Sequence, residues 1–158
     1  MKGGPRLLEV SKRHPRLRID RPALAAAVGR LDAAAGAFKQ GCPPGELSLA
    51  FMADAALARL HARYLGDASP TDVITFGGDA EHGLAGEICV SVDAAVRRVG
   101  SARSALSREI TLYVVHGWLH LAGYDDRTAA SKRAMRRAEA RAMRLLDRSG
   151  AVPRFELA

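Results

Sequence analysis

Two histidines four residues apart form the sequence pattern with the clearest chemical potential. His116 and His120 lie in the segment HGWLHLAGYDD, which spans residues 116–126. On a helix, side chains at positions i and i+4 lie one turn apart on the same face, so both imidazoles could bind one metal ion. Gly123 can end the helix and reverse the chain, which brings Asp126 within reach as a third ligand. Three protein ligands with one open position are typical of a catalytic zinc site.

Two other interpretations of this segment have to be weighed against a metal site. The histidines could be core residues, but apolar side chains surround them, and an unpaired imidazole is costly to bury there. These apolar neighbours are Leu112, Val115, Leu119 and Leu121. The spacing also resembles zinc peptidases, in which a Glu directly after the first His acts as general base. Gly117 occupies that position here, so peptide hydrolysis by this route is disfavoured.

The surrounding sequence predicts one α+β domain over residues 1–158. Strand patterns occur at residues 6–12, 46–52, 71–76 and 86–90. Helical patterns occur at residues 22–38, 53–64, 92–99, 108–121 and 128–148. Asp20, Ser91 and Ser107 are the expected N-caps of three of these helices. This order of elements predicts a small mixed sheet of about four strands, with about five helices packed largely on one side.

The composition favours a globular protein that interacts with polyanions. Hydrophobic residues make up 48% of the chain, enough for a core. There are 24 Lys and Arg against 17 Asp and Glu, and the resulting net charge of +7 makes nucleic acid a plausible partner. The uncharged stretch 110–124 is shorter than the roughly 20 residues of a membrane span. Without a signal-peptide pattern or a cysteine framework, since Cys42 and Cys89 are isolated, we expect a cytoplasmic protein without membrane association.

Three segments resemble those of a known family, and they occur in the family's order. The segment 116–126 resembles the signature His-Gly-x-Leu-His-Leu-x-Gly-Tyr-Asp-His of the YbeY family of bacterial endoribonucleases. PTDVITF at residues 70–76 is similar to the family's Pro-Thr-Asp-Val-Leu-Ser-Phe strand. GEICVS at residues 86–91 is similar to its Gly-Asp-Ile-x-Ile-Ser strand. The similarity extends from about Glu46 to Met143.

This resemblance implies a metal-dependent, single-strand-specific endoribonuclease that acts in ribosomal RNA maturation and ribosome quality control. The implied partners are single-stranded or ribosomal RNA and the small ribosomal subunit or its assembly factors. The family binds one zinc ion through three His, and His116 and His120 match the first two of them. Asp126 stands in place of the third His. Two His and one carboxylate form a known catalytic zinc set, although an anionic ligand also suits manganese or another divalent ion.

A second difference from the family concerns a cation near the site. Members of this family commonly carry an Arg just after the Tyr in the loop before the Pro-Thr-Asp-Val strand, whereas Leu65 follows Tyr64 here. Arg59 and Arg63 lie nearby but not at the matching position. The loss of this cation leaves a second function open, that of a non-catalytic, metal-stabilised factor that binds the ribosome or its RNA.

Two further features of the sequence allow more than one interpretation. Thr71 and Asp72 could orient the metal site or cap the strand that follows them. The last predicted helix carries a basic stripe, which is either a solvated face or an RNA contact face. The stripe consists of Arg133, Arg137, Arg141, Arg144 and Arg148.

Overall fold

The structure is a computed structural model, and it describes residues 6–66 and 71–158. Pro70, which begins one of the family-like segments, lies outside the described residues. Leu65 is the last residue of a helix, and its side chain is also outside the described part of the chain.

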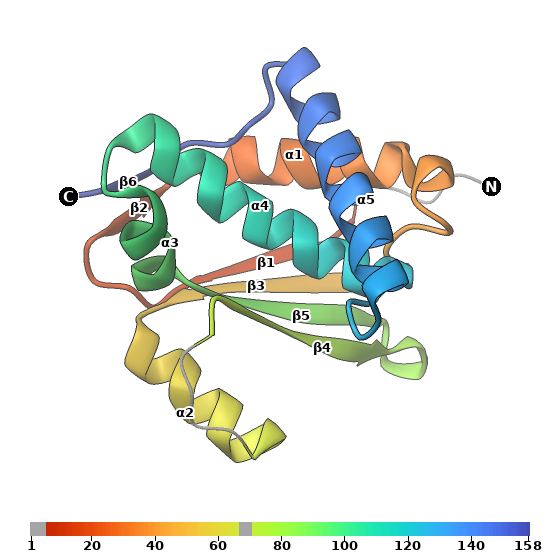
Figure 1. Ribbon diagram of the computed structural model, residues 1–158, viewed down its shortest axis with the longest axis horizontal. Coiled ribbons are helices and arrows are strands. Elements are labelled where there is room, and N and C mark those ends of the chain that lie inside the picture. The colour runs from red at the N-terminus through yellow and green to blue at the C-terminus, as the bar shows by residue number, and fades with distance from the viewer. Residues whose placement is uncertain (1–5, 67–70) are drawn as a thin grey trace.

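A four-stranded mixed sheet forms the centre of the fold (Figure 1). Its strands lie in the order β1, β3, β5, β4, with bounds Leu8–Lys12, Glu46–Met52, Leu84–Ser91 and Val73–Asp79. The pairs β1/β3 and β3/β5 are parallel, whereas β4 and β5 form an antiparallel pair. The predicted mixed sheet of four strands is therefore confirmed.

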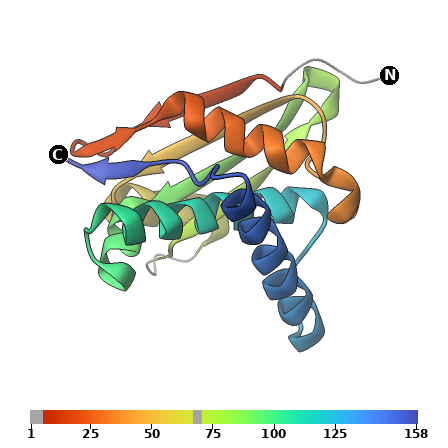
Figure 2. The same cartoon turned by 90° about the horizontal axis from the view of Figure 1, so that it is seen from above.

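Most of the helices cover one face of this sheet (Figures 1 and 2). Helices α1, α4 and α5 lie on that face, with bounds Arg21–Ala33, Arg103–Ala122 and Ala129–Arg148. Helix α3 (Val92–Val99) continues directly from the end of β5 and packs against α4. Helix α2 (Asp54–Leu65) covers the opposite face, where Leu57 belongs to a small second core with Ile74 and Cys89. This α+β arrangement agrees with the prediction.

Local sequence signals account for several helix ends. The Asp20 side chain accepts a hydrogen bond from the Ala23 amide, and Ser91 does the same for the Ala94 amide. These N-caps satisfy amides that have no partner within the helix. Gly123 ends α4 with a φ of 110°, a left-handed conformation that glycine adopts at little cost. All three ends are as predicted.

Helix α4 is the structural support of the predicted metal site. Most of its length is buried, and Trp118 is fully enclosed while its Nε1 donates to Asp32 Oδ1 at 3.0 Å. Burial on several sides explains the continuous apolar sequence of this helix. Within the described residues, no helix is both long and apolar enough to cross a membrane.

The predicted start of α4 needs correction, and a second small sheet accompanies the predicted one. Helix α4 begins at Arg103, and Ser107 is not its N-cap. Ser107 Oγ instead bonds the backbone of Phe155 in both directions, at 3.0 Å to the carbonyl and 2.9 Å from the amide. Phe155 belongs to β6 (Phe155–Leu157), which pairs with β2 (Leu17–Ile19) in a second, two-stranded sheet. Three-residue strands from opposite ends of the chain show no periodicity, so the sequence did not reveal them.

Helix α1 ends at Ala33, before the predicted end at residue 38, and a 3-10 turn (Ala35–Ala37) follows.

A glycine allows α4 to lie close to β5. A Cβ added at Gly117 would lie 2.5 Å from Ile88 Cγ2, a distance that side-chain carbons do not tolerate. Gly117 directly follows His116, so this contact fixes the height and rotation of α4 above the sheet at the predicted site.

We expect Gly117→Ala to lower the free energy of unfolding by about 1–3 kcal/mol, because the added methyl group overpacks the contact with Ile88. Gly29→Ala in α1 is the matched control, since nothing lies within 4 Å of its added Cβ. In that open position the better helix propensity of Ala should stabilise by about 0.5–1 kcal/mol. Denaturant unfolding of both variants tests this, and an equal effect of the two substitutions would contradict the packing argument.

Candidate metal centre

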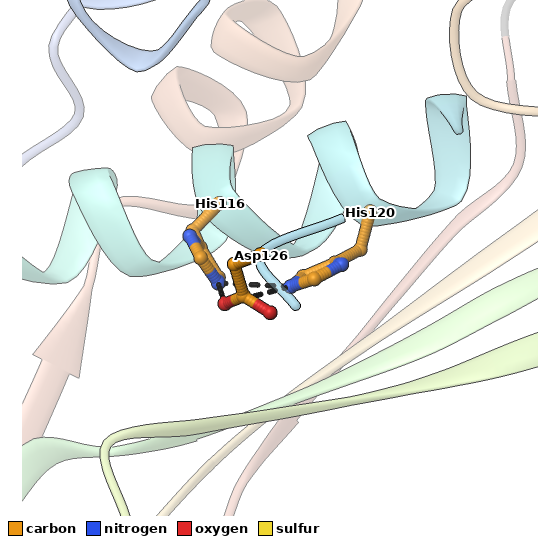
Figure 3. A group of neighbouring side chains, drawn as sticks. All are labelled: His116, His120 and Asp126. Atoms are coloured by element: carbon orange, nitrogen blue, oxygen red, sulfur yellow. Dashed lines mark hydrogen bonds and ion pairs between the residues drawn. The ribbon is translucent and has the colours of Figure 1, made fainter. Parts of the chain in front are cut away.

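The structure brings His116, His120 and Asp126 together (Figure 3). Both imidazoles project from α4 toward one point, and the Asp126 carboxylate reaches the same point from the loop after Gly123. The two Nε2 atoms are 3.0 Å apart, and each lies 3.7 Å from Asp126 Oδ2. Asp125 turns elsewhere, because its carboxylate accepts a hydrogen bond from the Arg127 amide.

The distances within this group suit a tetrahedral metal ion. With bonds of about 2.0–2.1 Å, two ligand atoms of a tetrahedral zinc lie about 3.3 Å apart. The observed separations of 3.0 Å and 3.7 Å lie on either side of that value. Two imidazole nitrogens and one carboxylate oxygen are also donors that zinc and similar divalent ions accept. The residues present therefore fit a metal ion.

Glu139 is a member of the site that the sequence did not reveal. From α5, its Oε2 lies 2.6 Å from His116 Nδ1. A carboxylate in this position accepts a hydrogen bond from the Nδ1–H group of His116. The proton is thereby held on Nδ1, and the lone pair of Nε2 faces Asp126 and His120. Carboxylate–histidine pairs of this kind orient the imidazole of metal sites.

The two histidines have opposite electrostatic surroundings. Burial alone would lower the pKa of His116, but the hydrogen bond and charge of Glu139, with the charges of Asp126 and Asp72, raise it. Burial and the neighbouring His116 lower the pKa of His120. The carboxylates around His116 therefore favour a positive charge at this point of the site. A divalent cation at the same point would satisfy the same charges.

A cleft of about 380 Å³ opens beside the three side chains. One wall is α4 with His116, His120 and Leu121, and the other is formed by β4 and the two residues before it. Thr71 and Asp72 line this cleft, so both lie at the site. The side chains of His116 and His120 are 22% and 27% exposed. A substrate can therefore reach the site from the cleft side.

A second carboxylate, Glu109, lies two turns before His116 on the same face of α4. Its side chain is 9% exposed, and within the described residues its Oε2 is buried without a hydrogen-bond partner. Among the described residues, Arg98 is the cation paired with this carboxylate, and its Nε lies 3.7 Å from that oxygen. Burial raises the pKa of Glu109; Arg98 opposes this shift, and Asp72 and Glu139 add to it. The ionised carboxylate is thus poorly stabilised in the folded protein.

The fold and the gathered side chains define a small α+β protein with a candidate catalytic metal centre. A profile of the family described as endoribonuclease YbeY matches residues 10–147. The endoribonuclease YbeY of Moorella thermoacetica is 38% identical over 122 residues, which cover 68% of this chain and 76% of that protein. That of Anaeromyxobacter sp. is 33% identical over 157 residues, 93% of this chain and 76% of the relative. That of Rhodopirellula baltica is 37% identical over 117 residues, 72% of this chain.

The match to the Rhodopirellula protein covers 60% of its length, less than two thirds. The solution structure of TM1509 from Thermotoga maritima has the same fold, with a TM-score of 0.58 and 19% identity. The alignment covers 92% of this chain and 95% of that one. The chain belongs to the YbeY family of endoribonucleases, as the three sequence segments predict.

Because folding disfavours the ionised form of Glu109, we expect Glu109→Gln to raise the free energy of unfolding at about pH 8. A raised pKa in the folded state means that stability falls as the pH increases through the ordinary pKa of Glu toward the folded value. The gain should therefore disappear below about pH 4, where wild-type Glu109 is protonated in both states. Thermal unfolding at both pH values tests this, with the exposed Glu81→Gln as control. A gain that persists at low pH would contradict the desolvation argument.

Proposed function

We propose that this chain is a metal-dependent endoribonuclease that cleaves single-stranded ribosomal RNA during its processing. The observation that carries the proposal is the convergence of His116, His120 and Asp126 at the wall of an accessible cleft, in a member of an endoribonuclease family. The proposed catalytic contribution of these three residues is to hold one metal ion.

Zinc is the proposed ion, because two His and one carboxylate are an established catalytic zinc set. Asp126 in place of a third His also admits manganese or another divalent ion, since carboxylates suit harder cations. A divalent ion held there supplies Lewis acidity toward a phosphodiester and toward water. The protein's part is to present the lone pairs of both Nε2 atoms, with Glu139 holding the proton on Nδ1 of His116.

A single strand is the proposed form of the substrate because the site is recessed. A flexible strand can bend a phosphate into the cleft between α4 and β4, whereas an A-form duplex presents a rigid and regular backbone. The net charge of +7 favours association with RNA at the ribosome. The family resemblance implies the small ribosomal subunit or its assembly factors as the setting, and the cytoplasm as the compartment.

The second candidate function is a non-catalytic, metal-stabilised factor that binds the ribosome or its RNA. The substitution of Asp126 for a histidine motivates it, because an anionic ligand reduces the Lewis acidity of the ion. Leu65 in place of the family's Arg also motivates it, because a cation near the site is lost. The two functions differ in one observable property, the turnover of RNA.

We expect the zinc-loaded protein to cleave a single-stranded ribosomal RNA fragment, and His120→Ala to cleave it at least about 100-fold more slowly because a ligand is lost. His82→Ala is the matched control, since His82 is an exposed histidine paired with Asp79. Cleavage is followed by gel electrophoresis with all proteins purified in the same way. Equal cleavage by His120→Ala would reject the proposed site, and RNA binding without turnover would favour the second candidate function.

Glu139→Gln should weaken zinc affinity about tenfold, because a neutral amide orients His116 less strongly than a carboxylate does. Asp125→Asn is the matched control: it removes a carboxylate next to Asp126, but one that points to Arg127. Competition with a chelator measures both affinities without reference to activity. If the two variants lose affinity equally, the specific role of Glu139 is wrong.

A further inference from the structure

A basic side chain connects the metal centre with a neighbouring surface cavity. The cleft at the metal centre contains no Lys or Arg among its described lining residues. A second cavity of about 290 Å³ shares His116, Asp126 and Asp72 with it, and Arg98 is the cation in its wall. A third cavity, of about 460 Å³, shares Arg98 and Asp72 and continues along α3. Because they share these residues, the three cavities adjoin one another, and we refer to the stretch of surface from His116 to α3 as the path.

Two arginines lie on this path, but they differ in their partners. Both Nη atoms of Arg97 donate to the Asp54 carboxylate, so Arg97 is committed to an ion pair within the protein. The Arg98 side chain is 75% exposed, and its partner among the described residues is Glu109, whose Oε2 lies 3.7 Å from the Arg98 Nε. That distance is too long for a hydrogen bond. The donors of Arg98 are therefore available to a ligand.

The position of Glu109 gives Arg98 a preferred orientation. The buried Oε2 of Glu109 attracts the Nε side of the guanidinium, at the border of the cavity that also contains His116. A guanidinium has a second edge, formed by its two Nη groups, which matches two oxygen atoms of a phosphate. With Nε directed to Glu109, this second edge is left for an anion in the path.

We propose that Arg98 binds a phosphate of the RNA strand next to the phosphate at the metal centre, so that the strand runs from the cleft along α3. This inference rests on the proposed function, since it assumes that RNA is the substrate. Arg98 acts on binding and positioning rather than on the reacting atoms. Phosphate recognition is independent of base identity, so the contact should serve every sequence equally.

The test is the affinity of the zinc-loaded protein for fluorescent single-stranded RNA, measured by anisotropy over a range of salt concentrations. Arg98→Ala should weaken binding about tenfold, and equally for oligo-U and oligo-A. The slope of log affinity against log salt should fall by about 0.7, the value for one phosphate contact on a single strand. Arg98→Lys should retain the slope because it retains the charge. Arg30→Ala, an exposed arginine of α1, is the control for loss of one charge, and thermal unfolding verifies that each variant is folded.

The binding measurements and the cleavage assay test the two proposals independently. If the wild type binds RNA but does not cleave it, the proposed nuclease function is wrong, while the comparison of Arg98→Ala with Arg30→Ala still decides the role of Arg98. Equal affinities and equal salt slopes for these two folded variants would overturn the proposal. A wild type that does not bind single-stranded RNA would overturn it as well.

Discussion

The close contact between α4 and β5 is the constraint on which the site depends. Gly117 allows the helix to lie directly on Ile88, and the buried Trp118 holds the next position through Asp32. With the helix fixed in height and rotation, the residues on either side of this contact, His116 and His120, project along the cleft edge. A small rotation of α4 would separate their Nε2 atoms from Asp126. The packing of an apolar helix thus sets the geometry of a polar site.

Helix α5 adds electrostatic control to this geometry. It is a strongly basic helix with two acidic residues, and both form ion pairs with α4. Asp147 pairs with Arg108 at 2.7 Å, and Glu139 pairs with His116 at 2.6 Å. The Asp147–Arg108 pair joins the two helices near the C-terminal end of α5. The Glu139–His116 pair holds a proton on Nδ1 of His116. The Glu139 pair therefore joins the packing of two helices to the chemistry proposed for the site.

The separation of interacting residues along the chain decides how much of the structure could be predicted from the sequence. His116, His120 and Asp126 lie within eleven residues, and helix geometry with a glycine stop relates their positions directly. Glu139 enters the site only because α5 packs on α4, so its single signal is that it is an isolated acid in a basic helix. The pairing of β2 with β6 has no local signal at all. The role of Ser107 also has no local signal, because its partner, Phe155, lies 48 residues away.

The most direct test of the account is the position of a bound ion. Anomalous diffraction from a crystal of the full chain grown with zinc would locate it. The account predicts one ion at about 2.0–2.2 Å from Nε2 of His116, Nε2 of His120 and a carboxylate oxygen of Asp126. The hydrogen bond between His116 Nδ1 and Glu139 should remain in place. An ion bound elsewhere, or at the two histidines with Asp126 turned away, would contradict the three-residue centre on which the proposed function depends.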